Sequence, residues 1–168
     1  MTKGVKRAKS GFTLVEMLCT IVVLLLVTGL MTVGVRLAVK AYDKEVSHAE
    51  SKELCATIRT LVNDELRYCN NVEVTEDSSG NTVISFFSQN YGENAEYTVD
   101  EEGQVLLGGN KILSAKSYSY NMRARVDISA YDKTTRIFDA SVTVTDTDGA
   151  VLAESNFQVK QLNKNVES

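Results

Sequence analysis

The sequence predicts an α+β protein in which a long N-terminal helix, transmembrane in its first half, packs on an antiparallel β-sheet. The residues from Phe12 to Val35 form an apolar run whose only charge is Glu16, and the pattern then stays helical to about Tyr68. Beyond Asn70 the apolar period changes to two. The chain has no proline, and glycine is absent between Val35 and Gly80, so nothing breaks this helix. A chain with a helix followed by a run of strands has the pattern of an α+β fold.

The segment from Phe12 to Val35 is long and apolar enough to cross a membrane. At a rise of 1.5 Å per residue it spans about 36 Å, more than the hydrocarbon core of about 30 Å. Four cations and no acid precede it: Lys3, Lys6, Arg7 and Lys9. Only Arg36 and Lys40 follow closely, so the positive-inside rule predicts a cytoplasmic N-terminus.

One charged residue, Glu16, interrupts the apolar segment. A carboxylate at the centre of a bilayer costs about 2.5–3.5 kcal/mol on insertion scales. We therefore expect Glu16 to have a partner.

The stretch Lys9-Ser10-Gly11-Phe12-Thr13-Leu14-Val15-Glu16 resembles the class III signal of the type IV pilin-like family. This family includes pilins, type II secretion pseudopilins and competence pilins. The resemblance covers residues 1–35 and implies that prepilin peptidase cuts between Gly11 and Phe12, after which Phe12 is methylated. Glu16 then becomes the fifth residue of the mature chain. There it can pair with the Phe12 ammonium of its own chain or of a neighbouring subunit.

The resemblance also implies partners and a location. The partners are prepilin peptidase, other pilin or pseudopilin subunits, the inner-membrane assembly platform and membrane lipid. The chain would cross a prokaryotic cytoplasmic membrane once, with its globular domain outside, and then enter a pilus or pseudopilus.

Within the family, the sequence favours a minor subunit over a major one. Val33 stands where major pilins commonly carry a helix-kinking proline, and the C-terminal cysteine pair common in major pilins is missing. Two alternatives stay open: a competence pilin for DNA uptake, and a static signal-anchored surface receptor or adhesin.

The helix continues past the apolar segment with one core-facing stripe. At 100° per residue the stripe is about 140° wide. Its members are Leu54, Cys55, Ile58, Leu61, Val62, Leu66 and Cys69. Glu65 falls inside the stripe, and we interpret it as a carboxylate that reaches out at the domain edge. His48 is interpreted as a solvated side chain. Cys55 and Cys69 lie about 21 Å apart along one helix, too far for a disulfide between them.

Three segments near the C-terminus alternate with period two and predict an antiparallel meander. The first runs from Ser117 to Ser129, the second from Phe138 to Thr145, and the third from Val151 to Val159. Asp146–Gly149 is predicted to be the turn between the last two. Weaker strand candidates are Thr82–Ser88, Glu96–Val99 and Gln104–Leu107, separated by turns at Ser79–Asn81 and Asp100–Gly103.

No pattern indicates an enzyme, a cofactor site or a metal site. Asp146 and Asp148 beside Gly149 could suggest calcium, but a hairpin turn explains them and the further ligands of an EF-hand are missing. The formal charge of −4 becomes −8 without the four N-terminal cations, which argues against nucleic acid as a partner. Arg123 and Arg125 on one strand face are interpreted as ordinary solvated cations.

The sequence thus divides into five parts. Residues 1–11 are the leader, 12–35 the transmembrane and assembly helix, and 36–70 the helix continuation. Residues 71–162 form the β-rich domain and 163–168 a polar tail.

Overall fold

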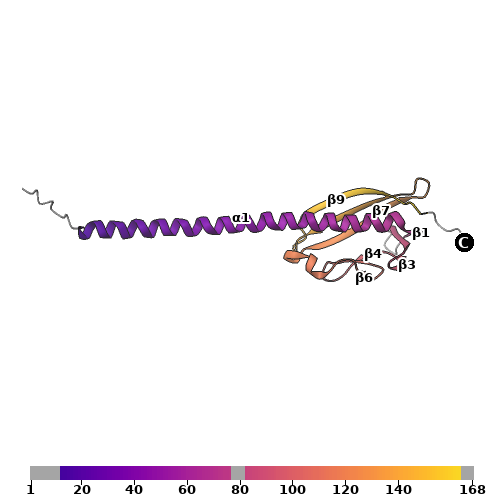
Figure 1. Cartoon of the computed structure of the whole chain (residues 1–168), viewed down its shortest axis with the longest axis horizontal. Coiled ribbons are helices and arrows are strands. Elements are labelled where there is room, and N and C mark those ends of the chain that lie inside the picture. Colours follow the sequence, from indigo (N-terminus) through magenta and orange to yellow (C-terminus); the bar gives the residue numbers. More distant parts are fainter. Residues whose placement is uncertain (1–11, 77–81, 164–168) are drawn as a thin grey trace, which may run out of the picture. The chain divides into compact units, whose positions relative to one another are not determined.

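The computed structural model describes residues 12–76 and 82–163, and its first element is one long helix, α1 (Leu14–Tyr68) (Figure 1). The helix passes through Gly29 and Gly34 without a break. The predicted helix is therefore confirmed, with its first helical residue at Leu14. The chain divides after Lys44 into two compact units, each of which is described by itself.

The first unit consists, in its described residues, of the N-terminal part of α1 and the two residues before it. Every residue from Phe12 to Lys44 is exposed. By length and composition this helix can cross a membrane.

In the second unit α1 buries one face. Its buried residues are Ser51, Leu54, Cys55, Ile58, Val62 and Leu66, followed by Cys69 just after the helix. The predicted stripe is thus confirmed except at Leu61, which is only half-buried. Cys55 and Cys69 are buried and free.

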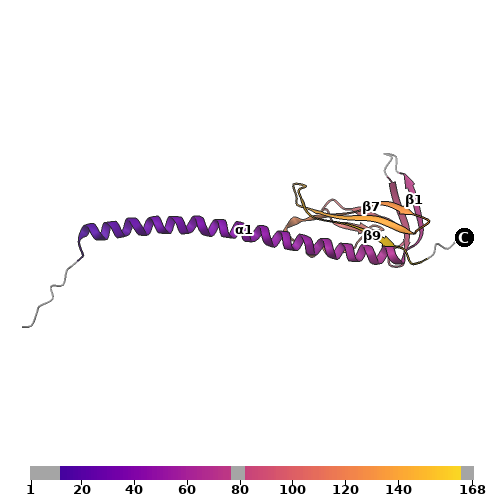
Figure 2. The ribbon, with the colours of Figure 1, turned by 90° about the horizontal axis from the view of Figure 1, so that it is seen from above.

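The main sheet is the predicted antiparallel meander, made of β7 (Arg123–Asp132), β8 (Ile137–Thr145) and β9 (Val151–Lys160) in that order. Its apolar face packs on α1 (Figure 2). Cys55 Sγ lies 3.7 Å from the Val142 carbonyl oxygen, and the Arg59 guanidinium lies 5.2 Å from the centre of the Phe157 ring.

The first strand of this meander starts later than predicted. Residues before Met122 form two 3₁₀ turns instead, η1 (Ala115–Ser117) and η2 (Ser119–Asn121). Tyr118 is buried and its hydroxyl accepts the Val105 N–H at 3.0 Å, whereas Tyr120 is exposed with a φ of 54°. Tyrosine is amphipathic, so the alternation of these two residues imitated a strand.

The last strand departs from its predicted alternation at one end. Val144 pairs with Ala153, but Thr145 pairs with Val151, so the register shifts by one residue. This irregularity turns Val151 outward to solvent, while Val159 stays buried as predicted.

Two small antiparallel sheets complete the domain. One contains β1 (Asn70–Glu76), β2 (Thr82–Ser88) and β3 (Gly92–Ala95), and the other contains β4 (Tyr97–Val99), β5 (Val105–Leu107) and β6 (Asn110–Lys111). β2 matches its prediction, β4 and β5 begin one residue late, and β1, β3 and β6 were not predicted.

The turn at Asp100–Gly103 is confirmed. The Gly103 N–H donates to the Asp100 carbonyl at 3.0 Å, and Gly103 has a φ of 80°, which favours glycine. The turn predicted at Ser79–Asn81 lies outside the described residues.

The C-terminal end of α1 is capped by residues that follow β9. Three donors reach its last carbonyls: Gln161 Nε2 to Cys69 O (3.0 Å), Leu162 N to Arg67 O (2.8 Å) and Asn163 Nδ2 to Tyr68 O (2.6 Å). Carbonyls at a helix end have no partner within the helix, so these bonds satisfy them. The predicted polar tail lies, apart from Asn163, outside the described residues.

Candidate functional site

The candidate site is the start of α1, where the predicted cleavage and assembly residues fall. Gly11 lies outside the described residues. Phe12 and Thr13 precede the helix, and the Phe12 side chain is exposed. The Met17 N–H donates to the Thr13 carbonyl at 3.2 Å, which makes Thr13 the N-cap residue of α1.

Glu16 and Thr13 form a reciprocal capping box. The Thr13 hydroxyl accepts the Glu16 N–H at 3.3 Å, and Glu16 Oε2 accepts the Thr13 N–H at 2.9 Å. The Thr13 hydroxyl also donates to Glu16 Oε2 at 3.0 Å. This arrangement satisfies two of the backbone donors that a helix start leaves unpaired. The structure thus gives Glu16 a local role besides the pairing that the sequence predicted.

Only one oxygen of the Glu16 carboxylate is used in this box. Both Thr13 donors reach Oε2, and no described residue donates to Oε1. An ionised carboxylate can accept about four hydrogen bonds, so Oε1 stays available for a donor such as an ammonium group.

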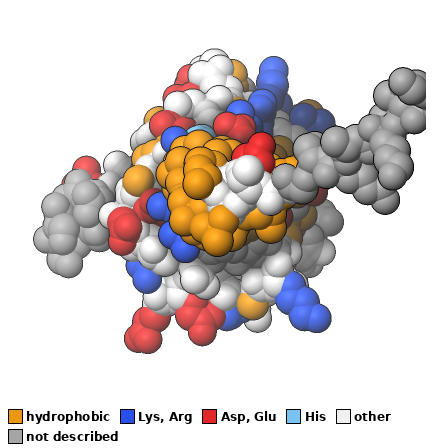
Figure 3. Space-filling model, turned by 90° about the vertical axis from the view of Figure 1, so that its left-hand side faces the viewer, with side chains coloured by type: hydrophobic (Ala, Val, Ile, Leu, Met, Phe, Trp, Pro, Cys, Tyr) orange, Lys and Arg blue, Asp and Glu red, His pale blue; other side chains and the backbone are white. Residues whose placement is uncertain are grey.

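Beyond Glu16 the apolar helix satisfies its polar side chains internally. Thr20, Thr28 and Thr32 each donate to the carbonyl four residues earlier, at 2.7, 2.8 and 2.9 Å. Such bonds let hydroxyls sit in a lipid-exposed helix without an outside partner. Seen from its N-terminal end, the helix is surrounded by hydrophobic side chains (Figure 3).

Two polar residues on the domain part of α1 can now be placed. Glu65 is half-buried and accepts hydrogen bonds from Ser88 Oγ at 2.8 Å and Asn90 Nδ2 at 2.5 Å, so it connects the helix to the end of β2 and to the loop that follows. His48 was predicted to be solvated, and this is wrong. It is half-buried with Nδ1 enclosed, because the domain covers α1 from Val46 onward.

The Asp146–Gly149 segment is the predicted hairpin turn. Asp146 Oδ1 accepts the backbone N–H groups of Asp148 and Ala150 at 2.9 and 2.8 Å, so this carboxylate is used to hold the turn. Among the described residues no group of three or more metal-ligating side chains comes together.

The two strand arginines are exposed on the outer face of the main sheet. Arg125 pairs loosely with Asp127 at 3.7 Å. Surface pairs of this kind contribute little, about 0–1 kcal/mol, and the placement fits solvated cations.

Thr13 is the functional residue that sequence reasoning missed. The spacing Thr13-x-x-Glu16 ahead of an apolar run is the capping-box signature, so the signal was present in the sequence.

Comparison with known proteins bears on the same segment. Residues 6–32 match the family model of the prokaryotic N-terminal methylation motif. No curated protein and no solved structure matches the chain significantly.

Proposed function

The chain carries the class III signal of type IV pilin-like proteins, and from this premise we propose that it is a structural subunit of a type IV pilus or a type II secretion-like pseudopilus. Prepilin peptidase removes residues 1–11 by cutting after Gly11, and Phe12 becomes the methylated N-terminus. The mature chain then assembles with other subunits through residues 12–35. The domain of residues 71–162 follows the helix continuation of residues 36–70.

The observation that carries this proposal is the geometry of Glu16. One carboxylate oxygen holds the helix start through Thr13, and the other accepts from no described residue. Cleavage creates an ammonium on Phe12, four residues away, at the point where the helix begins. A charge-assisted hydrogen bond between that ammonium and Oε1 would neutralise the acid within the apolar segment.

The partner in that bond can be the ammonium of the same chain or of a neighbour. Because the capping box fixes the carboxylate beside the helix axis, Glu16 is presented at a defined height on the apolar helix. A neighbour whose Phe12 reaches Oε1 would therefore be held in a fixed axial register.

The direction in which the chain crosses the membrane follows from the charges of the leader. The four cations before Gly11 favour a cytoplasmic N-terminus, and the domain then lies outside the cytoplasmic membrane. Removing these cations also removes a barrier to extracting the helix from the lipid, because charged groups cross a bilayer at high cost. The inner-membrane assembly platform would act at this step.

We favour a minor subunit. The chain lacks the proline and the C-terminal cysteine pair of major pilins, and Val33 lies within an unbroken α1. Among the alternatives, a competence pilin would use Arg123 and Arg125 on the exposed sheet face. A static receptor or adhesin would keep its leader and act where it is anchored.

Processing is the decisive experiment. The full chain is co-expressed with an active or an inactivated prepilin peptidase, and its N-terminus is sequenced. We expect a product eleven residues shorter that begins at Phe12, only with the active enzyme. A Gly11→Val variant should stay uncut. If the chain keeps its leader while a control pilin is cut in the same cells, the filament proposal is wrong and the static anchor is favoured.

A further inference from the structure

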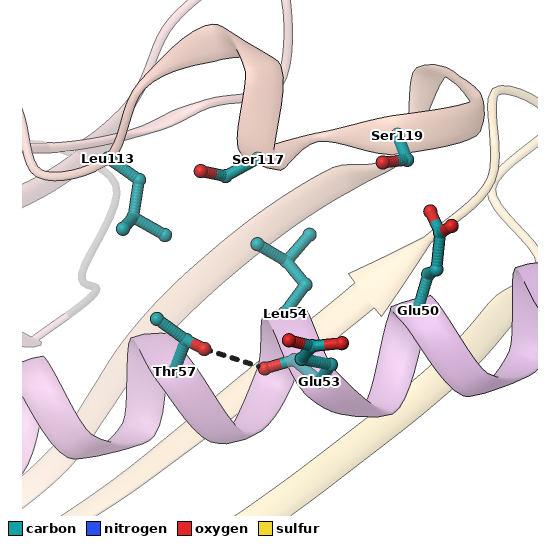
Figure 4. Close-up of a pocket in the computed structure, with 7 residues that line it drawn as sticks. All are labelled: Glu50, Glu53, Leu54, Thr57, Leu113, Ser117 and Ser119. Atoms are coloured by element: carbon teal, nitrogen blue, oxygen red, sulfur yellow. Dashed lines mark hydrogen bonds between the residues drawn. The ribbon is translucent and has the colours of Figure 1, made fainter.

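A groove lies in the globular unit between α1 and the two 3₁₀ turns (Figure 4). It has a volume of about 320 Å³. The helix contributes Glu50, Glu53, Leu54 and Thr57, and the opposite wall contributes Leu113, Ser117 and Ser119. The lining therefore carries two carboxylates and no cation.

The groove is rich in hydrogen-bond acceptors that have no donor. Glu50 Oε2 is enclosed and has no hydrogen-bond partner, and in Figure 4 this side chain rises from α1 toward Ser119. The side-chain hydroxyls of Ser117 and Ser119, which can donate or accept, make no hydrogen bond to the other residues drawn in Figure 4. Thr57 donates its hydroxyl hydrogen to the Glu53 carbonyl at 2.9 Å, so its oxygen can only accept. An enclosed carboxylate oxygen without a donor is costly, so this site favours an incoming donor.

The combination of walls and acceptors defines the kind of group that fits. Leu54 and Leu113 offer apolar contact, while the carboxylates accept charge-assisted hydrogen bonds. Lysine and arginine have this dual character, with an alkyl stem and a cationic head that only donates. A metal ion fits less well, because no third carboxylate, histidine or cysteine joins Glu50 and Glu53.

The chain itself carries a matching set of cations. Arg36, Lys40 and Lys44 follow the apolar segment at intervals of four residues, so they form one ridge on the helix surface. All three are exposed, and none makes an ion pair with another described residue. The spacing also means that these like charges repel one another, and an acidic partner would relieve that repulsion.

We propose that the groove binds a lysine or arginine of the ridge Arg36–Lys40–Lys44 from a second copy of this chain. The inference deepens the proposed function, on which it rests, because assembly through the N-terminal helices brings the ridge of one copy close to the domain of another. Two copies are enough for this contact, so it holds for a minor subunit too. The contact would add register between copies outside the lipid.

Cross-linking of the full chain in detergent micelles tests this contact. Unlabelled and ¹⁵N-labelled chains are mixed and treated with a carbodiimide, which joins a carboxylate directly to a lysine amine. Mass spectrometry then identifies peptides that join one labelled and one unlabelled chain. We expect Glu50 or Glu53 joined to Lys40 or Lys44 between chains.

Charge reversal makes the test specific. Because these substitutions also remove the groups that the carbodiimide joins, their effect is measured without cross-linker, as the association constant between chains from sedimentation equilibrium in the same micelles. The double variant Glu50→Lys/Glu53→Lys should lower this constant at least about fivefold, the factor that corresponds to about 1 kcal/mol of lost attraction. Lys40→Glu/Lys44→Glu should have the same effect, and the combination of all four changes should restore the constant. Glu101→Lys, an exposed change outside the groove lining, is the matched control and should leave the constant unchanged. Glu50→Gln, which keeps the shape and should also weaken association, covers the case in which the reversed variants do not fold.

Three results would overturn the proposal. The cross-links could join the groove only to Lys52 or Lys116 of the same chain, the association constant could survive the charge reversals, or ridge reversal could lower binding to anionic lipid vesicles without changing the association constant. The assay needs no peptidase. If a correctly processed chain lacks this contact, the proposed function therefore stands and the contact is wrong. If the contact forms in a chain that is never processed, the contact stands and the proposed function is wrong.

Discussion

Between Glu45 and Tyr68, α1 gathers its buried side chains on one face, whereas between Leu14 and Lys44 its apolar side chains are all exposed. The region from Glu45 to Tyr68 finds its apolar partners in the same chain, in the strands of the main sheet. The region from Leu14 to Lys44 has no such partners in the described part of the chain. Its burial must come from lipid or from other subunits, because an apolar surface of this length is unstable in water.

The same contrast holds for one carboxylate in each region. Glu65 accepts hydrogen bonds from a hydroxyl at the end of β2 and from an amide in the loop that follows. Glu16 accepts hydrogen bonds from a hydroxyl and a backbone N–H at its own helix start. Glu65 is thus part of the domain's internal structure. Glu16 keeps an oxygen open, and this leaves it able to bind another group.

We expect the largest effect when one apolar side chain is truncated in each region and the two losses in free energy of unfolding are compared. Ile58 is fully buried, and Ile58→Ala should lower the free energy of unfolding of the domain by about 2–5 kcal/mol. Leu25 is 68% exposed, and Leu25→Ala should change it by less than about 0.5 kcal/mol. Thermal and urea unfolding of the full chain in detergent, followed by circular dichroism of the strands, measures both. Equal destabilisation by the two changes would show that the region from Leu14 to Lys44 is also packed on protein.

The second prediction concerns the two carboxylates. Glu65→Ala should cost the domain about 1.5–3 kcal/mol, because it removes hydrogen bonds to a charged group and leaves the buried Ser88 hydroxyl without its acceptor. Glu65→Gln should cost less. Glu16→Ala should leave domain stability unchanged but abolish incorporation into filaments, measured by shearing and quantifying assembled subunits. Normal incorporation of Glu16→Ala would show that its open oxygen is dispensable.

The third prediction uses pH to probe burial at the end of α1. Burial raises the pKa of the Cys69 thiol from about 9 to about 12. Between these values the unfolded chain loses the proton and the folded chain keeps it, so the stability contributed by the protonated thiol is present below pH 9 and is lost as pH rises toward 12. At pH 10 the loss from Cys69 should be on the order of 1 kcal/mol.

The control for this prediction is Cys69→Ala, in which the free energy of unfolding should decline less steeply between pH 9 and 11. Part of this decline should persist, because burial also raises the pKa values of Cys55 and Tyr97. An unchanged slope in Cys69→Ala would contradict the assignment. In the native chain, Cys69 should also resist alkylation at pH 8 until the domain unfolds.

Much of this molecule could be predicted from the sequence, because two periodicities dominate it. The apolar run and the stripe around Ile58 gave the helix, and the alternation in β8 gave a central strand of the meander. The N-terminal methylation motif at residues 6–32 could be recognised because it is local. Patterns of this kind need only neighbouring residues to be recognised.

Contacts between distant residues were not predictable in this way. The groove forms only because η1 and η2 replace the expected start of a strand, and the tyrosines at 118 and 120 concealed those turns. Likewise, Gln161 and Asn163 cap the end of α1 across more than 90 residues of sequence, which no local pattern signals. Short edge strands such as β6 are too brief to show a period.

The smallest expected effect tests whether the start of α1 is held by its own residues or only by a partner. Thr13→Val keeps the shape of the side chain but removes the hydroxyl that accepts the Glu16 N–H. Loss of an N-cap residue costs about 1 kcal/mol, so hydrogen exchange of the Glu16 amide in micelles should become about fivefold faster. Thr13→Ser keeps the hydroxyl and should exchange at nearly the native rate. If Thr13→Val exchanges no faster than the native chain, the capping box does not hold Glu16. The carboxylate would then be free to turn either oxygen toward a neighbour, and its axial register would depend on the neighbour alone.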